Sequence, residues 1–294
     1  MRILSLSLLA VLFMTVNAQD KRTFIKAGKL FDGKTRALRE NVVITVEGAT
    51  IKDVQEKALI PSGANVIDLS GMTVMPGLID AHTHVVLHPG DYDAQSLRET
   101  PEYRAIHSVV NARATLEAGV TTIRDLGNEG AGFADIALRD AVAKGIVPGP
   151  RILAAIQPIT ATGAYGLVGY SPYVFTPQLS YEADGPSEIR KQVRRLVKLG
   201  ADVIKLYMES YEKRPLSADS LSGAMTYAPE EVKVLVGEAR RSHVKVAAHA
   251  YSDEAARIAI EAGVHSIEHG LYISEVTFRL MASRDVAYVP TLLV

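Results

Sequence analysis

The sequence contains no cysteine in 294 residues. This excludes disulfide bonds and thiolate metal sites, and it leaves histidine, carboxylate and lysine as the metal ligands. The chain also lacks a large net charge of either sign, since its formal net charge is only −1. It therefore has neither the basic surface typical of nucleic-acid binding nor a polybasic membrane patch. We expect a small-molecule substrate, no nucleic acid and no membrane partner, and we leave homo-oligomerisation open.

No apolar run reaches the length of a membrane span, which needs about 20 residues. The run that comes nearest is residues 3–16, which follows Arg2 and ends at Val16-Asn17-Ala18. A positive start, a short apolar run and small terminal residues are typical of a secretory signal. The pattern predicts a signal peptide over residues 1–18, with an uncleaved anchor as the alternative. We expect an exported protein, periplasmic or secreted.

Short apolar segments separated by turn residues follow the signal, over residues 19–73. Asp32-Gly33 and Glu47-Gly48 mark two of the turns. The pattern predicts a small, sandwich-like module of β-hairpins beside the main domain. Its strands are expected over residues 24–27, 29–31, 41–46, 50–54 and 64–69, with Gly28 as a break between the first two.

Helices and strands alternate in the main domain, residues 74–294. Three segments share one layout, in which a helix ends at Gly119, Gly200 or Gly263 and a strand follows. Repeated alternation predicts a parallel sheet, and this many repeats favour an α/β fold of the (β/α)₈ TIM-barrel type over a doubly wound sheet. We expect strands to end near His84, Asp125, Ala155, Lys205, His249, His269 and Thr291.

These are seven strands, and strand 8 of a barrel is missing before Val294. An unclosed barrel leaves two sheet edges without a partner. We therefore expect the chain to be a C-terminally truncated version of a longer protein. The barrel is still preferred, because polar residues lie at the carboxyl ends of strands, where barrel active sites are built.

Four histidines stand at such strand ends. Side chains two apart on a strand point to the same side, so His82 and His84 can converge on one metal ion. Taken alone, this pair is more typical of a turn with solvated imidazoles. His249 and His269 each end an apolar strand. Together with Lys205, the four imidazoles make a stronger case for a metal site than any one of them.

Lys205 lies inside the apolar strand Ile204-Lys205-Leu206. Burial lowers the pKa of an ammonium group. The neutral amine can then react with carbon dioxide to give a carbamate, an anionic ligand able to bridge two metal ions. The alternative is an ion pair with a carboxylate such as Glu209. Arg124 occupies the equivalent place after Gly119 and can be read as an ion-paired strand residue.

The other histidines receive structural interpretations. His107 is expected within a helix, His243 at a helix end and His265 in the loop before its strand. His88 follows strand 1 and is expected in a solvated loop.

Four segments resemble the amidohydrolase superfamily: Pro76–His84, Val203–Lys205, His249–Tyr251 and Ile267–Gly270. The resemblance is greatest to the binuclear branch of imidazolonepropionase-related proteins and Xaa-Pro or Xaa-Arg/Lys dipeptidases, and it covers nearly all of the mature chain. It implies two divalent metal ions, with zinc as the expected metal. One ion is held by His82 and His84 and the other by His249 and His269, with a carboxylated Lys205 bridging them.

In such enzymes a metal-bridging hydroxide attacks an amide carbonyl, here most plausibly that of a dipeptide or an N-acyl amino acid. The resemblance makes Tyr251 a candidate donor to the substrate oxyanion, with a packed rim tyrosine as the alternative. The proton-shuttling aspartate at the end of strand 8 is absent. Tyr165 stands where relatives often carry a glycine pair followed by histidine.

Two other functions stay open. One is hydrolysis of a cyclic amide of the imidazolone type, which in relatives typically uses one metal and no bridging lysine. The other is a non-catalytic binding protein or truncated fragment on the same scaffold.

Overall fold

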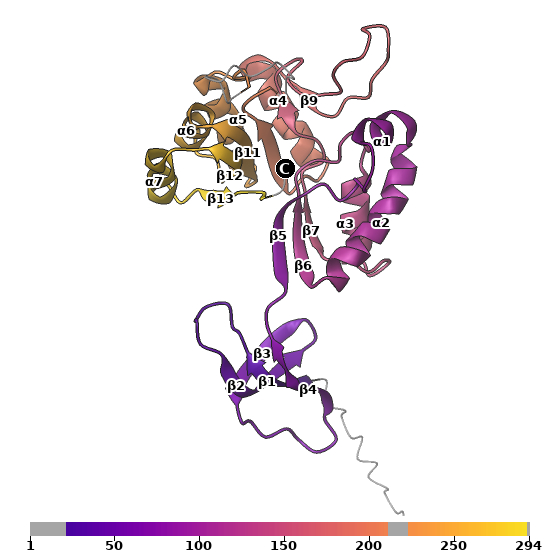
Figure 1. Ribbon diagram of the computed structural model, residues 1–294, viewed down its shortest axis with the longest axis vertical. Coiled ribbons are helices and arrows are strands. Elements are labelled where there is room, and N and C mark those ends of the chain that lie inside the picture. Colours follow the sequence, from indigo (N-terminus) through magenta and orange to yellow (C-terminus); the bar gives the residue numbers. More distant parts are fainter. Residues whose placement is uncertain (1–21, 211–222, 293–294) are drawn as a thin grey trace, which may run out of the picture. The chain divides into compact units, whose positions relative to one another are not determined.

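The computed structural model describes residues 22–210 and 223–292 (Figure 1). The predicted signal peptide lies outside these residues. The chain divides into two compact units, one ending at Pro76 and one beginning at Gly77. Among the described residues, none of the helices combines the length and the apolar character needed to cross a membrane.

The first unit is a mixed sheet of four strands in the order β3-β2-β1-β4. Its strands pair antiparallel from β1 to β2 and from β2 to β3, whereas β4 runs parallel to β1. Leu30, Val42 and Ile44 form its apolar core. A sandwich-like unit was expected, and residues 22–76 form one sheet with no second layer. The strands are β1 (Arg22–Leu30), β2 (Arg39–Glu47), β3 (Thr50–Glu56) and β4 (Asn65–Val74).

The second unit alternates strands and helices, as the sequence predicts. The three glycines expected to close helices all adopt left-handed φ values, 91° at Gly119 and 93° at Gly200 and Gly263. The elements are β5 (Leu78–Thr83), α1 (Tyr92–Arg98), α2 (Pro101–Glu117), β6 (Val120–Asp125), α3 (Ala134–Ala143), β7 (Arg151–Ala154), β8 (Ile159–Thr160), β9 (Tyr181–Glu182), α4 (Gly185–Lys198), β10 (Val203–Tyr207), α5 (Pro229–Arg241), β11 (Lys245–Ser252), α6 (Asp253–Ala262), β12 (Ser266–Tyr272), α7 (Glu275–Ser283) and β13 (Ala287–Val289).

All strand pairs in this unit are parallel, in the orders β5-β6-β7 and β13-β12-β11-β10-β8-β9. A hydrogen bond from Asp202 N to Ala154 O, 2.8 Å long, links the end of β7 to the start of β10. In Figure 1, helices α2 and α3 lie along one side of β5–β7. Apart from the two-residue strand β9, which lies outside β8, the order follows the chain, as in a TIM barrel. Within the described residues no strand pairs with the outer edge of β5 or β13, so the barrel is not closed.

Strand β10 shows how the fold directs the side chain of Lys205 to the inner face of the sheet. Its five residues are all buried, and successive side chains point to opposite faces. Ile204 and Leu206 pack into the large core that the helices share with the sheet. Val203 belongs to the small cluster of inward-facing residues, with Leu126, Ala155 and Ala247. Lys205 has the same parity as Val203 and therefore points inward.

Candidate active site

The four strand-end imidazoles meet in the second unit. The ring centroids of His82 and His84 are 5.4 Å apart, those of His82 and His269 are 4.8 Å apart, and those of His249 and His269 are 4.6 Å apart. His82 belongs to β5, His84 follows that strand directly, and the other two belong to β11 and β12. Residues far apart in the sequence thus form one cluster at the carboxyl end of the strands.

The side chain of Lys205 is fully buried beside this cluster. Its Nζ has no hydrogen-bond partner among the described residues and lies 5.4 Å from the ring centroid of Tyr207. Burial and the nearby charge of Arg124 lower the pKa of Lys205 to about 8. The ion pair with Glu209 is not formed, because Glu209 Oε2 accepts instead from the backbone N–H groups of Tyr251 at 2.5 Å and Ser252 at 3.1 Å.

Three of the imidazoles are held in the neutral form. Burial, followed by the positive charge of Lys205, lowers the pKa of His82 to about 4 and that of His269 to about 3. The same two causes lower the pKa of His249 well below its ordinary value. A neutral imidazole is the form that binds a metal ion, so these side chains are ready to act as ligands at neutral pH.

Hydrogen bonds select the nitrogen that carries the proton. Nδ1 of His82 lies 2.9 Å from Glu268 Oε2, and Nδ1 of His84 lies 2.9 Å from Gly127 O. Both oxygens can only accept, so each imidazole carries its proton on Nδ1 and keeps the Nε2 lone pair for a ligand. This arrangement is typical of metal-binding histidines.

The remaining two imidazoles differ. Nδ1 of His269 lies 2.7 Å from the hydroxyl of Thr291. Nδ1 of His249 is buried and has no hydrogen-bond partner within residues 22–210 and 223–292. His249 is therefore the imidazole whose Nδ1 is open to a ligand.

Glu268 is a functional residue to which the sequence assigned no role. It is fully buried and accepts from Arg124 Nη2 at 2.7 Å and from Ser266 Oγ at 2.5 Å. Burial raises its pKa, but the hydrogen bond from His82 and the charges of Lys205 and Arg124 outweigh burial and lower the pKa to about 2. The interpretation of Arg124 as an ion-paired strand residue is confirmed. A carboxylate within an apolar strand is the sequence feature that could have identified Glu268.

His269 reaches the site through an unusual backbone conformation. Its φ is 72°, in the left-handed region that residues other than glycine rarely adopt. Regular alternation along β12 would direct neighbouring Glu268 and His269 to opposite faces of the sheet. The left-handed turn instead lets Glu268 contact His82 while the ring of His269 packs against that of His249.

A pocket of about 380 Å³ opens beside the imidazoles. Tyr251 lies on its wall, with ring centroids 4.5 Å from His249 and 5.2 Å from His269. Tyr165 also lines the pocket and stacks on Tyr207 at 4.5 Å. A wall of aromatic rings with convergent polar groups is typical of a small-molecule site. The lining is His84, Tyr92, Asp93, Tyr165, Gly166, Leu167, Val168, Tyr207, His249, Tyr251 and His269.

Glu129 is a second residue that the sequence analysis missed. It follows β6, is 1% exposed, and lies with its Oε1 3.0 Å from Nδ1 of His84. Burial raises the pKa of Glu129, but the charge and hydrogen bond of His84 and the phenols of Tyr92 and Tyr165 outweigh burial and lower it. The pKa of His84 shifts in the other direction. Burial lowers it, but the charge and hydrogen bond of Glu129 outweigh burial and raise it.

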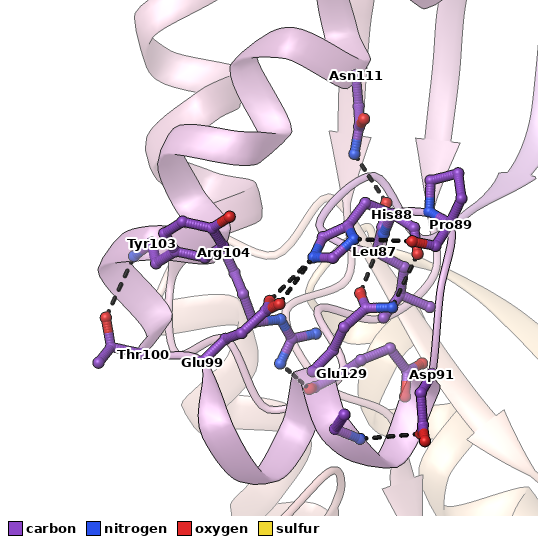
Figure 2. Close-up of polar contacts among 12 residues, drawn as sticks. Leu87, His88, Pro89, Asp91, Glu99, Thr100, Tyr103, Arg104, Asn111 and Glu129 are labelled. Atoms are coloured by element: carbon purple, nitrogen blue, oxygen red, sulfur yellow. Dashed lines mark hydrogen bonds and ion pairs between the residues drawn. The ribbon is translucent and has the colours of Figure 1, made fainter.

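His88 lies in a loop, as expected, but its ring is not freely solvated, since it is 16% exposed and bonded to Glu99. Figure 2 shows its ring between the α1–α2 junction and the loop that follows β5. Its Nε2 lies 3.0 Å from both carboxylate oxygens of Glu99, and its ring stacks on that of His107 at 4.3 Å. His107 lies in α2, as expected. His243 follows α5 with a φ of 57°, and His265 accepts from Val246 N just before β12.

The described side chains fit a pair of metal ions. Among residues 22–210 and 223–292, no three histidine, aspartate or glutamate side chains form a group that could hold an ion. The expected arrangement needs no such group, because it gives each ion two imidazoles and the shared Lys205. The buried Lys205 Nζ and His249 Nδ1, without partners among the described residues, are what a ligand would satisfy. Leaving such groups unsatisfied costs about 1–3 kcal/mol each.

Comparison with known proteins agrees with the fold. Residues 73–292 match the amidohydrolase family. The chain is 30% identical to ochratoxinase from Aspergillus niger over 93% of this chain and 59% of that enzyme. The parallel strands with histidines at their carboxyl ends define the class of the protein as an α/β protein of the barrel type. The chain belongs to the amidohydrolase family, whose fold is the (β/α)₈ barrel.

Solved structures give the same result. A Xaa-Pro dipeptidase with methionine bound in its active site has a TM-score of 0.80 and 33% identity, over 92% of this chain and 66% of that one. A prolidase complexed with N-methylphosphonate-L-proline has a TM-score of 0.80 and 30% identity over the same shares. The chain thus spans about three-fifths to two-thirds of the length of these relatives.

Proposed function

We propose that the protein is a metal-dependent amidohydrolase that cleaves the amide C–N bond of a dipeptide or an N-acyl amino acid. The observation that carries the proposal is the meeting of His82, His249 and His269, all neutral, with the buried amine of Lys205. They lie beside a pocket large enough for a small substrate. The names of the relatives, an ochratoxinase and a prolidase, support this choice of bond.

The proposal includes two divalent ions, with zinc as the expected metal. His82 and His84 would hold one ion, His249 and His269 the other, and a carboxylated Lys205 would bridge them. Bound metal would supply an ionised water as the nucleophile and polarise the substrate carbonyl. A pKa of about 8 keeps a fraction of Lys205 as the neutral amine that carbamate formation requires.

The protein's own side chains prepare this chemistry. Glu268 holds the proton of His82 on Nδ1, so that Nε2 faces the ligand. Tyr251 lies beside His249 and His269, and its hydroxyl would donate a hydrogen bond to the developing oxyanion. The aromatic wall that includes Tyr165 and Tyr207 would cover the apolar part of the substrate. The family resemblance implies an aspartate at the end of a strand 8 as the group that delivers the proton to the leaving amine, and the described residues do not include that strand.

We also propose that the protein is exported to the periplasm or secreted. The support is the charged start, apolar run and small residues over residues 1–18. The lack of cysteine means that an oxidising compartment imposes no disulfide requirement on folding.

Hydrolysis of a cyclic amide is the second candidate within the family. That reaction typically needs one metal and no bridging lysine, whereas Lys205 is buried with no partner among the described residues. The observation favours the two-metal reaction. A non-catalytic binding role on the same scaffold is the third candidate.

Metal analysis and a substrate screen on the protein made from its complete gene separate these functions. We expect two divalent ions per chain and release of the C-terminal amino acid from dipeptides or N-acyl amino acids. One ion per chain with cyclic amide hydrolysis would support the second candidate. Two bound ions without hydrolysis of any amide in the library would leave a binding role.

A further inference from the structure

The backbone of Glu129 is held in a conformation that needs outside support. Its φ is 49°, in the left-handed region, which costs a residue other than glycine about 1 kcal/mol or more. The guanidinium of Arg104, itself 2% exposed, donates to the carbonyl of Glu129 at 2.7 Å (Figure 2). A buried arginine on α2 thus fixes this turn, and the turn aims the carboxylate.

The carboxylate of Glu129 joins three separate parts of the second unit. Its Oε1 lies 3.0 Å from Nδ1 of His84, directly after β5. Its Oε2 accepts from the hydroxyl of Tyr92 on α1 at 2.5 Å and from that of Tyr165, in the segment between β8 and β9, at 2.8 Å. All three partners also line the pocket.

The protons in this cluster can be counted. The two phenols supply two protons, and their oxygens lie 3.1 Å apart. A carboxylate only accepts, so each phenol proton is used within the cluster. The Nδ1 proton of His84 faces Glu129 and Gly127 O, which also only accept. In its neutral form His84 is thereby restricted to the tautomer with its lone pair on Nε2, and a pocket ligand meets both phenol oxygens as acceptors.

We propose that Glu129 is a positioning residue that, together with Gly127 O, fixes the tautomer of His84 for metal binding and orients the hydroxyls of Tyr92 and Tyr165 on the pocket wall. The inference rests on the proposed function for the metal that His84 would hold. It adds a residue that is not itself a metal ligand. Both the metal-binding His84 and the two tyrosines of the pocket wall would depend on its buried carboxylate. The substrate group that reaches the two phenols is then a hydrogen-bond donor.

The test compares Glu129→Gln with a Tyr92→Phe/Tyr165→Phe double variant. Glutamine keeps the shape but places an N–H donor against either Nδ1 of His84 or the phenols. We expect metal affinity, measured by competition with a chelator, to fall about 10–100-fold, as for other partners of metal-binding histidines. The double variant leaves the contact with His84 intact. It should bind metal within twofold of the parent protein and raise KM.

Two results would overturn the proposal. One is an unchanged metal affinity in Glu129→Gln, and the other is an equal loss of affinity in Glu129→Gln and the double variant. If Glu129→Gln does not fold, the parent protein still decides. At a pH where His84 is neutral, nitrogen-15 spectra of the metal-free protein must show its single proton on Nδ1, and a single proton on Nε2 would overturn the inference. Failure of the proposed function is a separate outcome, because it appears as a parent protein that binds metal and hydrolyses no amide.

Discussion

His82 and His88 flank the same strand end, yet their surroundings shift their pKa values in opposite directions. His82 is buried beside Lys205, and burial followed by the charge of that lysine lowers its pKa to about 4. His88 lies nearer the surface and bonds to Glu99, chiefly through a hydrogen bond that raises its pKa. His82 is therefore neutral near pH 7, whereas the surroundings of His88 favour its cation.

The contrast extends to the two polar regions around them. In the strand-end region, burial dominates for His82, His249 and His269. In the region drawn in Figure 2, the hydrogen bond to Glu99 outweighs burial and raises the pKa of His88. The difference supports the proposal of a ligand site in the first region, whereas His88 in the second holds a loop against the α1–α2 junction. The predictions below test this difference.

Lys205→Ala should have the largest effect. If Lys205 bridges two ions, its loss removes metal and amide hydrolysis together, and we expect kcat/KM to fall by about 10³-fold or more, in the range for loss of a central catalytic group. Metal content and steady-state kinetics measure both effects.

Leu206→Ala is the matched control on the same strand, because Leu206 faces the helices. It should lower the free energy of unfolding by about 2–5 kcal/mol, as for other buried leucines, and keep both ions. Retention of two ions in Lys205→Ala would return that side chain to a structural role.

Glu268→Gln should lower the free energy of unfolding by about 3–5 kcal/mol, because it leaves Arg124 as a largely buried charge without its partner. Denaturant unfolding of the metal-free protein measures the loss. Glu275→Gln is the control, since Glu275 and Arg279 are 78% and 77% exposed. Exposed pairs of this kind contribute about 0.3–0.5 kcal/mol. An equal loss of unfolding free energy in the two variants would contradict the larger contribution expected of the buried Arg124–Glu268 pair.

Returning metal to the stripped protein should raise its stability. A ligand at 100 times its Kd stabilises the folded state by about 2.7 kcal/mol for one site. We expect a gain of at least this size in thermal or denaturant unfolding, and none in Lys205→Ala. A gain of equal size in that variant would place the bound ion away from the strand-end imidazoles.

His88→Gln should have the smallest effect, and its pH dependence gives the test. The pKa of His88 is raised in the folded state. The stabilisation from its cation is therefore fully present below the unfolded pKa of about 6.5 and is lost as the pH rises through the higher folded value. The difference in unfolding free energy between parent and variant should be largest near pH 5 and shrink toward pH 9. A difference that grows with pH would contradict the pairing with Glu99.

The sequence alone determined the features that depend on local pattern. Buried strands followed by helices that close at Gly119, Gly200 and Gly263 led to a parallel barrel-type fold, because a left-handed cap is a local requirement. Alternation along a strand placed Lys205 on the inner face opposite Ile204 and Leu206. The family resemblance supplied the ligand set, which the structure brings together.

Only the tertiary structure decided the partners of these groups. Arg124 and Glu268 are separated by 144 positions and pair because β6 and β12 face each other across the interior. His269 turns inward through a left-handed φ, and Glu129 meets His84, Tyr92 and Tyr165 from three separate elements. Such contacts arise when distant strand ends converge on one buried space. Periodicity sets which face a side chain occupies, whereas the packing of the sheet sets which charge it meets there.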